Sequence, residues 1–151
     1  YNGSNWTEVN DLGTARKGLS GIGTATSALA FGGATDPGAA SALTETWNGT
    51  NWTETGDLNT ARNISGGAGA DSTSALAYGG YTTTYVAVTE EWNGTNWTET
   101  TNISTARSSG GSSGTATAAL YSGGQNPAGK LTTTEEFTGA GAGQTRTFTD
   151  S

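Results

Sequence analysis

The stretch Trp47-Asn48-Gly49-Thr50-Asn51-Trp52-Thr53-Glu54 returns unchanged as Trp92-Asn93-Gly94-Thr95-Asn96-Trp97-Thr98-Glu99, and a near copy runs from Tyr1 to Glu8. An aromatic residue, a short turn containing Asn-Gly and a second aromatic residue that begins a Trp-Thr-Glu run are typical of a β-hairpin. Gly adopts positive φ without steric cost, and Asn tolerates it better than most residues. One hairpin copied at a fixed spacing predicts a repeat architecture.

The repeat is about 45 residues long. Its first aromatic recurs at intervals of 46, 45 and 45 residues, at Tyr1, Trp47, Trp92 and Phe137. An arginine inside Thr-Ala-Arg and a glutamate follow the same spacing, at Arg16, Arg62 and Arg107 and at Glu45, Glu90 and Glu135. Gly-Gly pairs recur at 47 and 44 residues, so the changes in length fall in loops.

Each repeat predicts four short strands. A small-residue segment such as 18–24 is followed by an apolar run before Gly-Gly, at 28–31, 75–78 and 118–121. A variable loop comes next, at 34–42, 81–87 and 125–131. The third strand ends in Thr-Glu-x-aromatic, and the Asn-Gly turn leads to the fourth, Asn-Trp-Thr-Glu. No segment has a sustained 3.6-residue apolar period, so we expect essentially no helix. Four short strands per repeat match a propeller blade.

The Thr-Ala-Arg opening, the Gly-Gly after an apolar strand, the Glu-x-aromatic and the Asn-x-Trp resemble the kelch repeat over residues 12–137. This resemblance implies an all-β fold of kelch-like β-propeller blades. The strand before Gly-Gly is poorer in bulky residues than in typical kelch blades, and the turn between the two aromatics is tighter. The Trp-Asn-Gly-Thr-x-Trp-Thr repeats also resemble those in structural, tail or appendage, proteins of marine and cyanobacterial viruses.

We interpret residues 1–151 as a single repeat domain. Three four-stranded blades are expected at roughly 14–54, 60–99 and 105–148, with an extra N-terminal outer strand at 5–9. Closed propellers usually have four to eight blades, and open ends leave unpaired strand edges. We therefore expect a homo-oligomer, simplest as a dimer of three-blade chains closing a six-bladed ring. The alternative is that the chain is cut from a longer array.

The last blade has two candidate outer strands. Counting 45 residues on from Trp97 gives Ala142, so the hairpin motif decays after Phe137. We favour a replacement strand within Gln144–Asp150, centred on Thr145–Thr149, because repeat proteins need modified terminal units. Alternatively, Asn5–Val9 completes the third blade, in the same or another copy.

Composition narrows the choice of partners. The chain carries 6 basic and 13 acidic residues, a formal charge of −7, and only 13% charged residues. This acidic balance, without any basic run, disfavours nucleic acid. No apolar run approaches the 18 residues of a membrane span, so we expect no membrane insertion. A polar, lysine-poor and cysteine-free chain favours an extracellular or virion location.

The residue types disfavour catalysis. The chain has no His and no Cys, which removes Ser-His-Asp triads, thiol nucleophiles and the usual zinc ligands. Glu90-Glu91 and Glu135-Glu136 are adjacent on predicted strands, so their carboxylates point to opposite faces and form no glycosidase pair. We expect no enzymatic activity, no metal and no cofactor.

The leading functional hypothesis is a non-enzymatic binding or structural module of a virion appendage or extracellular assembly. The alternative is a carbohydrate-binding lectin with sites at blade interfaces, since its hairpin is similar to that of small lectins whose two-blade chains trimerise. The candidate ligand residues share the repeat spacing and are Trp47, Trp52, Trp92, Trp97, Arg62, Arg107, Glu45 and Glu90. The same residues are also explained as packing between blades. The partner would be a glycan or a host-surface receptor, and the variable loops are the better general place for ligand contacts.

Overall fold

A computed structural model describes residues 3–139 of the chain. These residues form β-strands joined by turns and loops, and no helix occurs among them. The prediction of an all-β chain without helix is confirmed for this part. No helix that could cross a membrane is found within it.

Two four-stranded antiparallel sheets follow each other along the chain. The first has the order β1-β2-β3-β4 and the second β5-β6-β7-β8. The first consists of β1 (Ser20–Gly23), β2 (Ala28–Phe31), β3 (Thr44–Trp47) and β4 (Trp52–Glu54). The second consists of β5 (Gly66–Asp71), β6 (Ser74–Tyr78), β7 (Thr89–Trp92) and β8 (Trp97–Glu99).

The third sheet has three strands among residues 3–139, in the order β13-β10-β9. They are β9 (Gly111–Thr115), β10 (Ala118–Ser122) and β13 (Thr134–Thr138), with a small hairpin of β11 (Gln125–Asn126) and β12 (Gly129–Lys130) in the variable loop. The strand predicted within Gln144–Asp150 lies outside the described residues.

The repeated Asn-Gly stretch forms the predicted hairpin. The Asn48 side-chain oxygen accepts hydrogen bonds from the backbone N–H groups of Thr50 and Asn51, both at 2.9 Å. Gly49 has φ +94°, which a residue with a side chain rarely adopts. The turn sets Trp47 directly opposite Trp52. The second copy repeats this geometry, with Trp92 opposite Trp97.

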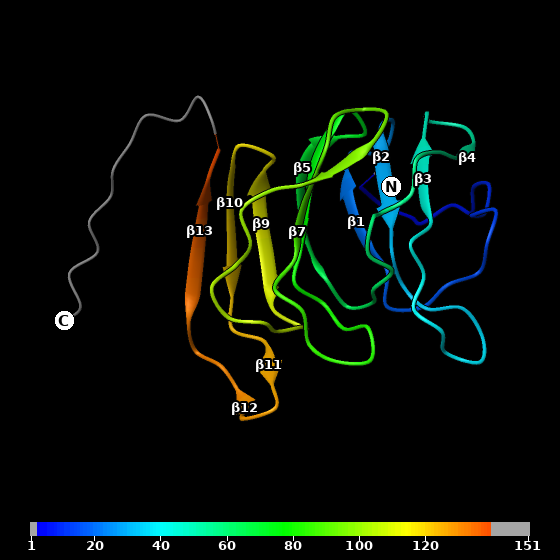
Figure 1. Cartoon of the computed structure of the whole chain (residues 1–151). Helices are drawn as coiled ribbons and strands as arrows, with labels where there is room; N and C mark the ends of the chain where they lie inside the picture. The colour runs from blue at the N-terminus through cyan, green and yellow to red at the C-terminus, as the bar shows by residue number, and fades with distance from the viewer. Residues whose placement is uncertain (1–2, 140–151) are drawn as a thin grey trace.

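The three sheets stand side by side, the second between the other two, and the first strands β1, β5 and β9 are neighbours (Figure 1). Glycine permits this approach: a Cβ on Gly67 of β5 would lie 2.8 Å from the Phe31 ring. The small residues of the first strands therefore bring the sheets close together.

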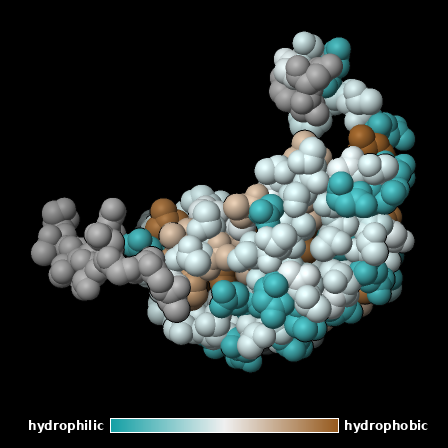
Figure 2. All heavy atoms as spheres, turned by 90° about the horizontal axis from the view of Figure 1, so that it is seen from above, coloured by the Kyte–Doolittle hydropathy of each residue, from teal (hydrophilic) through white to brown (hydrophobic). Residues whose placement is uncertain are grey.

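The apolar core consists of two interfaces between sheets. Along β2, Leu29 and Phe31 point to the second sheet, and along β6, Leu76 and Tyr78 point to the third. Alternation along each strand allows one sheet to contribute to both interfaces. Away from them the surface is mostly polar, with small separated apolar patches (Figure 2).

Two details of the sequence interpretation are corrected. Residues 5–9 contain no strand in this structure, because no strand among residues 3–139 pairs with them. In the third sheet, Ser122 and not Tyr121 directly precedes Gly-Gly, so Tyr121 takes the place of Ala77 and points to the second sheet. Leu120 consequently takes the place of the buried Leu76, on the other face, and is 44% exposed.

Candidate functional site

The three repeated arginines each form an ion pair with the glutamate of their own repeat. The pairs are Arg16 Nη2 to Glu45 Oε1 at 2.9 Å, Arg62 Nη1 to Glu90 Oε1 at 3.0 Å, and Arg107 Nη2 to Glu135 Oε1 at 3.0 Å. All three arginine side chains are fully buried. The exposed fraction of the glutamate side chain rises from 3% and 0% in the first two pairs to 24% in the third.

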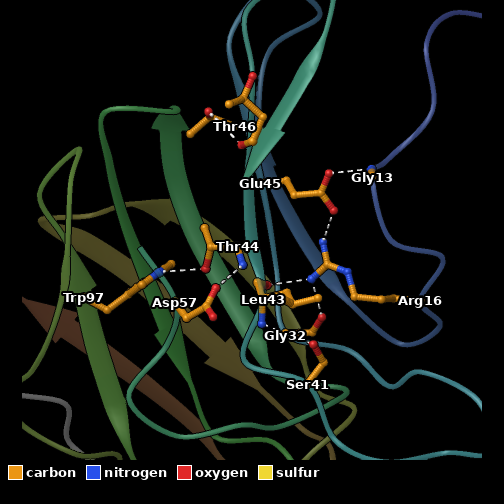
Figure 3. A network of polar contacts seen from close by, with 11 residues as sticks. Gly13, Arg16, Gly32, Ser41, Leu43, Thr44, Glu45, Thr46, Asp57 and Trp97 are labelled. Atoms are coloured by element: carbon orange, nitrogen blue, oxygen red, sulfur yellow. Dashed lines mark hydrogen bonds and ion pairs between the residues drawn. The ribbon is translucent and has the colours of Figure 1, made fainter. Parts of the chain in front are cut away.

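Backbone carbonyls complete the arginine contacts. The Arg16 guanidinium donates to the carbonyl oxygens of Gly32 at 2.7 Å and Leu43 at 2.6 Å (Figure 3). Arg62 donates to the carbonyl of Ala77 at 3.1 Å, and Arg107 to that of Tyr121 at 3.0 Å. Arg62 and Arg107 therefore tie the segment before their sheet to its second strand, and Arg16 ties its segment to residues just after β2 and just before β3.

The second carboxylate oxygen of each glutamate accepts a hydrogen bond from a backbone N–H group. Glu45 Oε2 accepts from the N–H of Gly13 at 2.7 Å, and Glu90 Oε2 from that of Asn59 at 2.6 Å. Both carboxylate oxygens are thus engaged. Burial lowers the pKa of Arg62, and the nearby Glu90 carboxylate opposes that shift. Each of these Arg–Glu pairs therefore holds the segment that precedes the sheet against that sheet.

The tryptophans of the hairpin have two different roles. The first of each pair fixes its own sheet: the Trp47 indole N–H donates to the Ala25 carbonyl at 2.9 Å, and Trp92 does the same to Ser72. In the second hairpin, the second tryptophan reaches the preceding sheet. Trp97 lies edge-on to Phe31, with ring centroids 5.0 Å apart. It donates its indole N–H to Thr44 Oγ1 at 2.9 Å (Figure 3).

The structure places the predicted ligand residues mainly inside the protein. Seven of the eight are buried, and only Trp52 is half-buried. The structure brings Arg62 together with Glu90 and pairs the tryptophans of each hairpin, whereas Arg107 lies with Glu135, outside the predicted set. The packing of the sheets therefore uses the side chains that the lectin hypothesis assigns to a ligand.

The three variable loops lie at one end of the sheets (Figure 1). Between the second and third loops runs a groove, here called the loop groove, lined by Tyr81, Thr83, Thr84, Tyr85, Ala106 and Pro127. The Tyr81 and Tyr85 rings meet edge to face, with centroids 5.3 Å apart. Two half-exposed aromatic rings beside hydroxyl groups are suited to contact a ligand.

Sequence reasoning missed a second hollow, beside Thr89. This Thr89 cavity lies between the second and third sheets and is lined among others by Tyr78, Thr89, Ile103 and Phe137. A repeated threonine before each repeated glutamate, at Thr44, Thr89 and Thr134, was the available signal.

No family model matches the chain, and no curated protein matches it. Among solved structures, that of YjhT is similar over 83% of this chain and 43% of the YjhT chain, with a TM-score of 0.69 and 16% identity. The chain thus spans less than half the length of that protein. At this level of identity the likeness concerns the fold alone.

Proposed function

We propose that this chain is a non-enzymatic β-propeller module, built of kelch-like blades, that serves as a structural and binding part of a virion appendage or another extracellular assembly. The observation that carries the proposal is the buried Arg62–Glu90 pair. The equivalent arginines and glutamates of the other repeats also bind each other within the protein, so these recurring charged residues stabilise the fold.

The arrangement of the sheets supports the propeller assignment. Each repeat contributes antiparallel strands in sequential order, and the first strands adjoin one another along one side of the arc. This is the arrangement in which blades surround an axis. Three such units form an arc, and the fold similarity to YjhT covers 43% of that longer chain.

The binding surface of the module is, in this proposal, the loop end. Loops on a rigid scaffold vary without disturbing the core. The loop groove offers Tyr81 and Tyr85 there, whereas the repeated tryptophans stay in the packing. A glycan or a protein receptor on a host surface would contact these rings.

The lectin alternative has a narrower basis. Of the predicted ligand residues, Trp52 alone is partly exposed, beside a hollow that also contains Asn10, Asp11 and Arg16. An indole face next to polar groups can bind a sugar ring. Titration with neutral monosaccharides, read by tryptophan fluorescence and repeated on Trp52→Ala, tests this site.

The structural assignment is tested by two neighbouring glutamates of β7. Glu90 is buried against Arg62, and Glu91 points to solvent. We expect Glu90→Gln to lower the free energy of unfolding by about 3 kcal/mol or more, because it leaves a buried guanidinium without its charge partner. Glu91→Gln is the matched control and should change it by less than about 0.5 kcal/mol.

Urea unfolding measures both variants, and a glycan array accompanies it. The structural role would be wrong if the two variants were equally stable and the natural chain bound a glycan that Glu90→Gln no longer binds. Glu90 would then be a ligand-binding residue.

A further inference from the structure

The Thr89 cavity repeats a site that is filled elsewhere in the chain. In the first interface, Trp97 packs among Phe31, Leu58 and Trp92 and donates to Thr44. The residues of the cavity lie one repeat further on, since Tyr78, Thr89, Ile103 and Phe137 follow Phe31, Thr44, Leu58 and Trp92 by 47, 45, 45 and 45 residues. The cavity therefore matches the tryptophan site at these four positions, with Tyr121 in the place of Ala77.

A buried polar atom marks the missing occupant. Thr44 Oγ1 accepts the indole N–H of Trp97 at 2.9 Å. Thr89 is 2% exposed, and its Oγ1 has no hydrogen-bond partner within the described part of the chain. Leaving such a group unsatisfied costs free energy, so a donor aimed at Thr89 would be favoured.

The strand that would carry this donor also has a place to pair. In the first two sheets, β3 and β7 each pair with a fourth strand that begins with tryptophan. Their counterpart β13 pairs with β10 on one side, and no strand of residues 3–139 covers its other edge. Thr134 is exposed, whereas its counterparts Thr44 and Thr89 are buried. Among residues 3–139, the edge and the cavity thus lack the same element, a fourth strand with its tryptophan.

Residues 5–9 have the sequence of that element. Asn5-Trp6-Thr7-Glu8 matches the Asn-Trp-Thr-Glu of β4 and β8, and Trp6 is 87% exposed. The turn before it is already formed in part, because Gly3 has φ +88°, close to the +94° of Gly49 and Gly94.

The segment that follows Trp6 is anchored to the first sheet as its counterpart is to the second. Asn10 Nδ2 donates to Thr50 O at 3.0 Å and to Asn51 Oδ1 at 2.7 Å, and the N–H of Gly13 donates to Glu45 as that of Asn59 donates to Glu90. The N-terminal segment therefore lies at the first sheet, and β13 stands at the opposite side of the arc (Figure 1). For residues 5–9 to reach β13, they would have to come from another molecule.

We propose that residues 5–9 of a second copy of this chain pair antiparallel with β13, with Trp6 opposite Phe137, and that this Trp6 enters the Thr89 cavity and donates its indole N–H to Thr89 Oγ1. The register follows from Trp47 opposite Trp52 and Trp92 opposite Trp97. Each copy offers one strand and one edge, so two copies join twice, head to tail, into a closed ring of six sheets.

The same association covers two further surfaces. Leu120 is 44% exposed where its counterparts Leu29 and Leu76 are fully buried, and Trp52 is half-buried where Trp97 is 5% exposed. Both lie on the sheet faces that the second copy would meet. This inference rests on the proposed propeller arrangement, but its failure is distinguishable: the Glu90→Gln comparison reads contacts within one chain, and the following experiments read contacts between chains.

Cysteine pairing tests the register, because the natural chain has no Cys. Thr7 and Glu136 are exposed, and the proposed pairing puts them opposite each other, as Thr53 stands opposite Thr46. Mixing Thr7→Cys with Glu136→Cys under mild oxidation should give a disulfide-linked heterodimer, identified by its mass. Thr7→Cys mixed with Thr98→Cys, which is equally exposed on β8, is the control. A yield no higher than that control would overturn the proposal.

Equilibrium sedimentation of full-length variants tests the occupant. Trp6→Ala should weaken dimerisation about 30-fold or more per interface, as for a buried aromatic anchor. Thr89→Val should weaken it about tenfold per interface while leaving the unfolding of the single chain unchanged or improved. A chain ending at Gly139 should dimerise as before. If that shortened chain loses the dimer while Trp6→Ala keeps it, residues 140–151 fill the site and the proposal is wrong.

Discussion

The Thr44 site and the Thr89 cavity share four equivalent wall residues and differ at Tyr121, which replaces Ala77, and only the first holds a tryptophan within the described chain. Trp97 closes the first by packing on Phe31 and bonding to Thr44. The second has the equivalent buried threonine, Thr89, whose hydroxyl has no hydrogen-bond partner among residues 3–139. In the second unit the fourth strand, β8, completes its own sheet, and its Trp97 completes the packing on the preceding sheet.

The largest expected difference between the two sites comes from removing the two tryptophans. Trp97→Ala should lower the free energy of unfolding by about 3–5 kcal/mol, because it empties a fully packed interface. Trp6→Ala, measured at a dilution where the chain is monomeric, should change it by less than about 0.5 kcal/mol, since Trp6 is 87% exposed. Urea unfolding followed by circular dichroism compares them. Equal losses would show that Trp6 already serves the fold of the single chain.

Replacing each of the two threonines by valine should have different effects on the free energy of unfolding. Thr44→Val removes the acceptor of the buried Trp97 indole and should cost about 1–3 kcal/mol. In the monomer, Thr89→Val removes an unsatisfied hydroxyl and should be neutral or slightly stabilising. The shift of the urea midpoint measures both. A comparable loss in both variants would mean that the Thr89 hydroxyl already has a partner.

Much of the fold could be predicted from residues with strict local requirements. Asn48 and Gly49 define their turn by chemistry that few other residues supply, and the fixed spacing of Arg62 and Glu90 marked both as recurring residues of the repeat. Their role could not be predicted, because the spacing alone does not tell whether a charge faces a ligand or a neighbouring strand. Burial decided that question.

Other features depended on long-range contacts. In the third repeat Ser122 stands between the apolar run and Gly-Gly, so Tyr121 takes the position of Ala77 and not that of Tyr78, and its facing could be read only from the structure. The strand predicted at residues 5–9 had the right sequence, but a strand also needs an edge to pair with. The role of Thr89 could not be predicted from the sequence, because it depends on the burial of its hydroxyl beside a cavity.

The smallest expected difference concerns alkaline pH. Phe31 lines the Thr44 site, and Tyr78 lines the Thr89 cavity. Burial raises the pKa of Tyr78, and it raises the pKa of Tyr121 in the same way. Because the folded chain holds these phenol protons more tightly, their contribution is present below the ordinary tyrosine pKa of about 10 and is lost as pH rises through the raised value.

Stability should therefore fall above about pH 10, and Tyr78→Phe, which copies the residue of the first site, should reduce the fall. Unfolding free energies at about pH 9 and about pH 11 measure the effect. An identical fall in Tyr78→Phe would place the sensitivity elsewhere.

The molecular mass in solution tests the central claim most directly, namely that Trp6 of one copy enters the Thr89 cavity of another. Sedimentation equilibrium over a range of concentrations should give twice the chain mass for the natural protein, and Trp6→Ala should move towards the mass of a single chain. A single-chain mass at every concentration, or an unchanged dimer in Trp6→Ala, would contradict it.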